Sequence, residues 1–93
     1  IKELFGEKGE EIPVHTIKST LGESYGASGA AQTASALLSI SNDLVPPTIN
    51  CDKKDPECNL NIVNEKLEKE VNTVLINSFD LSGNNSCLVV KKV

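Results

Sequence analysis

The stretch SYGASGAAQTASALLSISN, residues Ser24 to Asn42, contains no charged side chain. Its pattern predicts a helix from Ser28 to Ser41, with Ser28 as the N-cap. A helix on a protein surface shows a polar stripe, whereas the short side chains here allow other segments to pack closely on several faces. The stretch therefore predicts a helix enclosed between the layers of a larger core.

The chain as a whole offers little with which to enclose that helix. It has 93 residues, 39% of them hydrophobic, which fits one modest unit without an internal domain boundary. Such a chain supplies too little apolar surface to bury a helix on all sides. Together with the absence of methionine, this leads us to expect that residues 1–93 are a piece of a longer protein.

Composition also narrows the function. The net charge is −4 and the nine basic residues are scattered, which disfavours a nucleic-acid surface. Cys51, Cys58 and Cys87 lack Cys-x-x-Cys spacing and His15 is the only histidine, so neither a disulfide framework nor a metal site is predicted. We expect free, mostly buried thiols in a reducing cytoplasm, and no cofactor. We also expect no membrane association, because no signal peptide or membrane span is recognisable.

The segments before the helix are short. Residues 1–5 predict the end of a helix that stops at Gly6, and residues 7–11 a charged surface turn. Residues 12–20 are apolar and β-branched enough to predict a strand, which would place Lys18 near its end.

The segments after the helix are extended. Pro46 and Pro47 hold the chain straight, and residues 51–70 are polar and predicted to be exposed. Residues 71–79 and 86–93 predict two strands that pair as an antiparallel hairpin. The first is nearly continuous in apolar character, which predicts burial on both faces and a layered α/β architecture.

Several short motifs now occur in a recognisable order. They are Lys-Ser-x-x-Gly at 18–22, Gly-Ala-x-Gly at 26–29, VPPTIN at 45–50, DPECNLN at 55–61, NSF at 77–79 and LVV at 88–90. In this order they resemble the C-terminal part of a β-ketoacyl synthase of the thiolase fold, over essentially the whole chain. The resemblance implies a layered α-β-α-β-α fold whose buried helices lie between two sheets, with this chain as its C-terminal segment ending in an antiparallel hairpin.

The resemblance also implies a chemistry. In active members of the family a cysteine nucleophile takes an acyl chain from an acyl carrier protein. Two histidines then assist decarboxylation of a malonyl unit by donating hydrogen bonds to its thioester carbonyl. The cysteine and the first histidine are expected outside this chain, since neither Cys51 nor Cys58 falls at a nucleophile motif.

Two residues of the first motif matter for that chemistry. Lys18 matches the family's active-site lysine, but Glu23 stands where the family carries its second histidine. The reaction needs a hydrogen-bond donor aimed at a developing oxyanion, and an ionised carboxylate only accepts. We expect Glu23 either to pair with Lys18 or to lie against the following helix entrance, where the helix dipole favours a negative charge.

Two other parts of the chain also differ from the family's pattern. Gln32 stands where active members commonly carry a glutamate, and SFDLSGNN replaces the family's SFGFGGHN gate. The changed loop is expected to be stiffer and to lack its bulky gate. The gate residues are Phe79, Asp80, Leu81, Ser82, Gly83 and Asn85, with Asn84 at the family's histidine. His15 is expected to be a structural or surface histidine. Tyr25 could line a tunnel, but a packing role is expected.

These features give three functional hypotheses. The first is a non-condensing subunit resembling the chain-length factors of type II polyketide systems. Its partners would be an active ketosynthase subunit, or the N-terminal part of its own ketosynthase, and an acyl carrier protein. The second is an active or decarboxylating 3-oxoacyl-acyl-carrier-protein synthase that tolerates Glu23. The third, a small interaction domain, is disfavoured by the uncharged helix.

Overall fold

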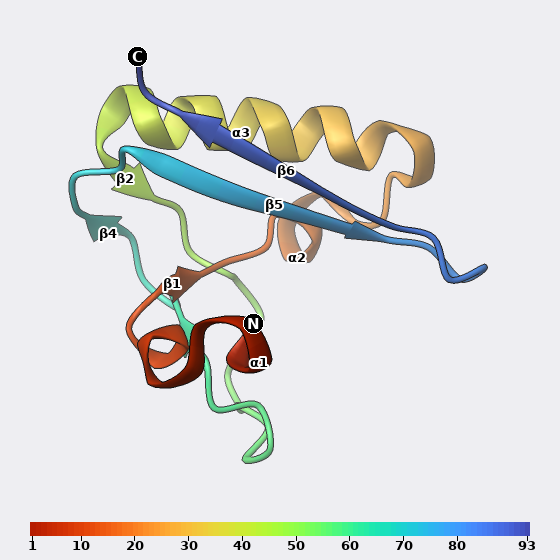
Figure 1. The fold of residues 1–93 in the computed structure, drawn as a ribbon, viewed down its shortest axis with the longest axis horizontal. Coiled ribbons are helices and arrows are strands. Elements are labelled where there is room, and N and C mark those ends of the chain that lie inside the picture. Colours follow the sequence, from red (N-terminus) through yellow and green to blue (C-terminus); the bar gives the residue numbers. More distant parts are fainter.

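A computed structural model describes all of residues 1–93. The chain alternates short helical turns with short strands and contains one long helix and one long hairpin (Figure 1). The elements are α1 (Lys2–Phe5), η1 (Gly6–Glu10), β1 (Pro13–Val14), α2 (Lys18–Leu21), η2 (Tyr25–Ala27), α3 (Ser28–Asn42), β2 (Leu44–Val45), β3 (Asn61–Ile62), β4 (Leu67–Glu68), β5 (Thr73–Phe79) and β6 (Asn85–Lys91). None of the helices has the length and apolar character needed to cross a bilayer.

The predicted long helix is confirmed as α3, whereas its enclosure between layers stays a prediction, since Leu37 and Leu38 are 51% and 64% exposed within these residues. The helix runs alongside the β5–β6 hairpin (Figure 1) and packs against β5, β6 and β2. It ends at Asp43, which adopts a left-handed conformation and returns its N–H to the carbonyl of Ser39. The predicted N-cap is wrong, because Ala27 occupies that position and Ser28 is the first helical residue. The Ser28 hydroxyl donates to Glu23 instead of capping the helix.

The hairpin is also confirmed. β5 and β6 pair antiparallel in a register that runs from Thr73 opposite Lys91 to Phe79 opposite Asn85. Burial of its first strand on both faces is wrong within these residues, since Leu75 and Phe79 are 38% and 70% exposed. The physical reason is that a single helix can cover only one face of a two-stranded sheet.

The predicted strand over residues 12–20 is largely wrong. Only Pro13–Val14 is a strand, and it pairs in parallel with β3. Lys18 begins α2 rather than lying at a strand end. The cause is the Thr16 side chain, whose hydroxyl accepts the N–H of Lys18 at 3.2 Å and so starts a helical turn. The Thr16 N–H is in turn fixed by the hydroxyl of Thr48 at 3.0 Å.

Residues 51–70 are less uniformly exposed than predicted. The charged side chains between positions 65 and 70 are exposed as expected, but Val63 is only 6% exposed. Its N–H donates to the carbonyl of Val14 at 2.9 Å, and its carbonyl accepts the N–H of Thr48 at 2.7 Å. These bonds anchor the segment to the small core that Val63 forms with Ala36, Ile40 and Val45.

The three cysteines are free, as predicted, but they are not mostly buried. Cys51 is half-buried, and Cys58 and Cys87 are exposed. Both exposed cysteines lie outside the small core, Cys58 in the polar segment and Cys87 on the hairpin strand β6.

Candidate active site

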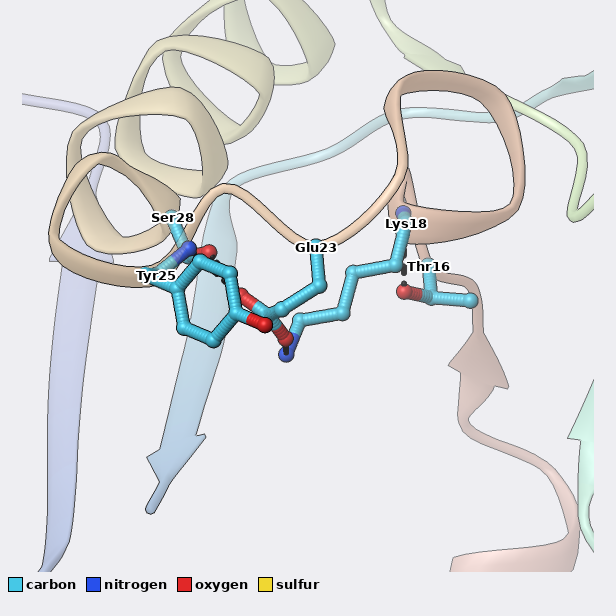
Figure 2. Close-up of polar contacts among 5 residues, drawn as sticks. All are labelled: Thr16, Lys18, Glu23, Tyr25 and Ser28. Carbon is cyan, nitrogen blue, oxygen red and sulfur yellow. Dashed lines mark hydrogen bonds and ion pairs between the residues drawn. The ribbon is translucent and has the colours of Figure 1, made fainter. Parts of the chain in front are cut away.

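The candidate site lies where α2 turns into α3. α2 ends at Gly22, which has a φ of 79° and returns its N–H to the carbonyl of Lys18. This φ lies in the region that side chains disfavour, so glycine suits the position. The turn brings the Glu23 side chain back beside that of Lys18, and Figure 2 shows the two pointing toward one another.

Glu23 uses both of its carboxylate oxygens. Oε2 forms an ion pair with the Lys18 ammonium. Oε1 accepts the Ser28 hydroxyl at 2.5 Å and the Tyr25 N–H at 2.9 Å (Figure 2). Both expectations for Glu23 are therefore confirmed, because it pairs with Lys18 and also lies at the entrance of the long helix. Tyr25 has a φ of 47°, an unusual value for an aromatic residue, and this backbone conformation accompanies the bond to Oε1.

These contacts stabilise the ionised form of Glu23. The hydrogen bond from Lys18, followed by those from Ser28 and Tyr25, lowers the pKa of Glu23 from 4.5 to about 2. The carboxylate is therefore ionised at neutral pH and offers acceptors only. A group in this state cannot donate a hydrogen bond to a developing oxyanion.

Removing the ammonium should change the titration of Glu23. We expect Lys18→Met to raise the pKa of Glu23 from about 2 toward 4.5, because the largest cause of its depression is lost. A depressed carboxylate pKa contributes stability above pH 4.5 that disappears as the pH falls toward 2, so this pH dependence should weaken in the variant. The titration is measured by NMR at the Glu23 side-chain carboxyl carbon.

A matched control exists in the second ion pair of the chain, Lys66 with Glu68, whose atoms are 2.7 Å apart. Lys66→Met should leave the pKa of Glu23 unchanged. An unaltered Glu23 titration in Lys18→Met would show that the ion pair does not lower the pKa of Glu23.

Two hollows connect the predicted site residues. Lys18 and Gln32 line a small cavity between α2 and α3 and also a larger cleft of about 550 Å³. Phe79 lines the larger cleft as well. The fold therefore brings Lys18, Gln32 and Phe79 to one cleft, and Glu23 joins them through its ion pair. The catalytic roles implied for these residues stay predictions.

The remaining gate residues lie apart from the cleft. The loop from Asp80 to Asn84 projects at the free end of the hairpin (Figure 1). Asp80 Oδ1 accepts the N–H of Ser82 at 2.8 Å, its hydroxyl at 3.0 Å and the N–H of Asn84 at 2.9 Å. Oδ2 accepts the Asn84 amide at 2.8 Å, and Leu81 is fully exposed. Bonds from Asn84 and then from Ser82 lower the pKa of Asp80 to about 2.

Asp80 should therefore order this loop. We expect Asp80→Ala to accelerate hydrogen exchange at the amides of Ser82 and Asn84, because both lose their acceptor. In the unmodified protein the same loosening should occur as the pH falls from about 4 toward 2 and Asp80 becomes protonated. Amide-resolved exchange measures both effects. Asp52→Ala, in another exposed loop, is the control, and equal exchange in all three proteins would contradict the prediction.

Some features of the site could not be predicted from the sequence. Ser28 was expected to cap a helix, yet it donates to Glu23. The spacing of five residues between Glu23 and Ser28 indicates this hydrogen bond only when the turn at Gly22 is already known. Tyr25 is 84% exposed, so a packing role is wrong within these residues. His15 is half-buried, burial lowers its pKa, and its Nδ1 atom has no partner. No group of three His, Cys, Asp or Glu side chains is arranged to hold a metal.

Comparison with known proteins places the site in a family. Residues 1–52 match the family described as β-ketoacyl synthase, C-terminal domain. The chain is 39% identical to 3-oxoacyl-[acyl-carrier-protein] synthase 2 of Coxiella burnetii, over 100% of this chain and 23% of that protein. It is 37% identical to the tetracenomycin polyketide synthase ketoacyl synthase alpha subunit of Streptomyces glaucescens, over 98% of this chain and 22% of that protein.

Solved structures agree. One is a type II polyketide synthase acyl-carrier protein in complex with its ketosynthase bound to the hexaketide, which matches with a TM-score of 0.94 and 32% identity over 99% of this chain and 23% of that chain. The ishigamide ketosynthase/chain length factor matches with a TM-score of 0.70 and 36% identity over 73% of this chain and 17% of that chain. The chain thus spans less than a quarter of the relatives it matches. Its fold is that of a thiolase-like ketosynthase C-terminal segment, and it belongs to the β-ketoacyl synthase family.

Proposed function

We propose that residues 1–93 belong to a ketosynthase subunit that does not itself condense. The observation that carries this proposal is Glu23, which stands at the family's histidine position and whose ionised form is further stabilised by Lys18, Ser28 and the Tyr25 N–H. Its negative charge would repel the oxyanion that forms during decarboxylation. Loss of a single oxyanion donor typically lowers a rate by about 10²–10³-fold, and a charge of the wrong sign opposes the reaction further.

The role that remains for such a subunit is that of a chain-length factor. The subunit would pair with an active ketosynthase and work with an acyl carrier protein in polyketide or fatty-acid elongation. Two similar structures support this assembly, since one pairs a ketosynthase with an acyl-carrier protein and the other is a ketosynthase/chain length factor. The self-contained loop at Asp80 and the replacement of the family's gate phenylalanine by Leu81 fit a site without a working gate.

The proposal is tested with the full-length polypeptide that carries this segment. Purified alone, it should not decarboxylate malonyl-acyl-carrier protein above the background rate. Addition of an active ketosynthase subunit should give a complex that elongates acyl chains. Malonyl turnover by the isolated subunit would overturn the proposal. A cysteine at the upstream nucleophile position, followed by an intact histidine motif, would also contradict it.

The alternative is an active or decarboxylating synthase, and one observation favours it. The Coxiella burnetii relative is named a synthase and is 39% identical over the whole of this chain. For this alternative to hold, the charge of Glu23 would have to leave decarboxylation unaffected, or another residue would have to donate the hydrogen bond to the oxyanion. Turnover by the isolated subunit separates the two candidates directly.

A further inference from the structure

Residues 45–50, the VPPTIN motif, contact the start of the helical turn that carries Lys18. The Thr48 hydroxyl accepts the N–H of Thr16, 32 positions earlier in the chain, at 3.0 Å. The Thr16 hydroxyl in turn accepts the N–H of Lys18 at 3.2 Å (Figure 2). Two consecutive hydrogen bonds therefore connect the motif to the first residue of α2.

A second contact reaches the same turn from Asn50. Its side-chain amide donates to the carbonyl of Ser19 at 3.4 Å, and the Ser19 hydroxyl donates to the carbonyl of Thr16 at 3.2 Å. The chain is thus bonded on both sides of Lys18. The Lys18 ammonium takes no part in these bonds and pairs with Glu23.

Thr48 is itself fixed to the small core. Its N–H donates to the carbonyl of Val63 at 2.7 Å, and Val63 is 6% exposed. Val45, at the other end of the motif, is also buried. The two prolines that separate Val45 from Thr48 have a restricted φ, so the connection between them is short and stiff. The Thr48 hydroxyl is therefore an acceptor in a well-defined place.

The turn that carries Lys18 needs such support from outside. α2 has only four residues, and so short a helix is not stable by itself in water. Ile17 occupies its N-cap position and makes no side-chain hydrogen bond there. The Thr16 hydroxyl is thus the side-chain acceptor for the first N–H of α2, and Thr16 is in turn bonded to Thr48.

We propose that Thr48 is a positioning residue for Lys18 and acts on it through Thr16. The side chain of Lys18 is 41% exposed, so packing alone does not fix its long and flexible stem. The start of α2 therefore determines where the ammonium can reach, and Thr48 fixes that start. This role goes beyond the proposed function and does not depend on whether the subunit condenses.

The titration of Glu23 in the full-length polypeptide tests the role of Thr48. Thr48→Val removes the hydroxyl and keeps a side chain of similar shape. The Lys18 ammonium should then move away from Glu23, which should raise the pKa of Glu23 from about 2 part of the way toward 4.5. Thr48→Ser keeps the hydroxyl and should titrate like the unmodified protein. An unchanged Glu23 titration in Thr48→Val would overturn the proposal, as would a serine variant that behaves like the valine variant.

A double variant shows whether Thr48 acts through Lys18. In Lys18→Met the ammonium is already absent, so adding Thr48→Val should raise the pKa of Glu23 no further. A further rise would mean that Thr48 affects Glu23 by another route, and it would overturn the positioning role. General loosening of the site would produce that further rise, because Ser28 and Tyr25 also bond to Glu23.

Thr33→Val is the matched control. The Thr33 hydroxyl donates to the carbonyl of Gly29 at 2.8 Å within α3, so the variant loses one hydroxyl hydrogen bond without touching α2. It should leave the pKa of Glu23 unchanged, and a rise equal to that of Thr48→Val would overturn the proposal. If Thr48→Val does not fold, Thr16→Val breaks the next bond of the same series and should also raise this pKa. An unchanged titration in Thr16→Val would count against Thr48 equally.

None of these readouts measures malonyl turnover, so failure here is distinct from failure of the proposed function. A full-length subunit that decarboxylates malonyl units, while its Glu23 titration responds to Thr48→Val, would overturn only the functional proposal. A silent subunit whose Glu23 titration ignores Thr48→Val would overturn only the positioning role.

Discussion

Replacement of Glu23 by histidine should raise malonyl-acyl-carrier-protein decarboxylation by the full-length subunit about 10²–10³-fold. The wild-type carboxylate accepts hydrogen bonds from Lys18, Ser28 and Tyr25 and donates none. An imidazole at this position can donate a ring N–H to the thioester carbonyl. The exchange also removes a negative charge that opposes the developing oxyanion. The rate is measured as carbon dioxide release, with and without an active ketosynthase partner.

Two further variants separate the effects of charge and hydrogen-bond donation. Glu23→Ala removes the negative charge without adding a donor, whereas Glu23→Gln removes the charge and adds an amide donor. We expect the rates to rise in the order alanine, glutamine, histidine. An alanine variant as fast as the histidine variant would show that charge alone suppresses the reaction. A wild-type rate equal to that of Glu23→His would favour the active-synthase alternative.

The ion pair behind this prediction could be deduced from sequence because it is local. Lys18 and Glu23 have opposite charges and lie five positions apart across a glycine, so a single turn suffices to join them. The contribution of Ser28 could not be deduced in the same way. A serine before a helix can serve as its cap or donate elsewhere, and here Ser28 donates to Glu23 across a turn in which Tyr25 has a φ of 47°. The residues around Tyr25 do not predict that backbone conformation.

The same distinction between local and distant contacts applies to the fold. The helix α3 and the β5–β6 hairpin were predictable, because each carries a long, consistent pattern of its own. The two-residue strands β1 and β3 were not, since Val14 and Ile62 pair across 48 positions through bonds that no local pattern encodes. Thr16 shows how such a contact overrides propensity. The β-branched residues around Thr16 favour a strand, but the hydrogen bonds of Thr16 with Thr48 and Lys18 direct the chain into helix α2 instead.

Burial was the least predictable property. Val63 lies in a largely polar tract, yet it is 6% exposed because β1 and Thr48 hold its backbone. Conversely, β5 reads as a fully buried strand but keeps an exposed face within residues 1–93. The apolar pattern describes the surroundings of the strand in a complete layered core, whereas this segment contributes only some of those layers.

The small core itself should be sensitive to truncation at Ile40. Ile40 is 7% exposed on α3, the helix that packs against both β2 and β5. We expect Ile40→Ala to lower the free energy of unfolding by about 2–5 kcal/mol, through lost burial and the cavity left behind. Alanine is the better helix former, so any loss reports packing rather than helix propensity. Denaturant unfolding of the full-length protein measures the change.

The neighbouring exposed residue Ser41 provides the matched control, because it lies on the same helix outside the core. Ser41→Ala should change the free energy of unfolding by no more than about 0.5 kcal/mol. If Ile40→Ala has an equally small effect, the surroundings of Ile40 must collapse into the space left by the removed methyl groups. A large loss confined to Ile40→Ala would instead show that α3 is packed tightly against β2 and β5 at this position.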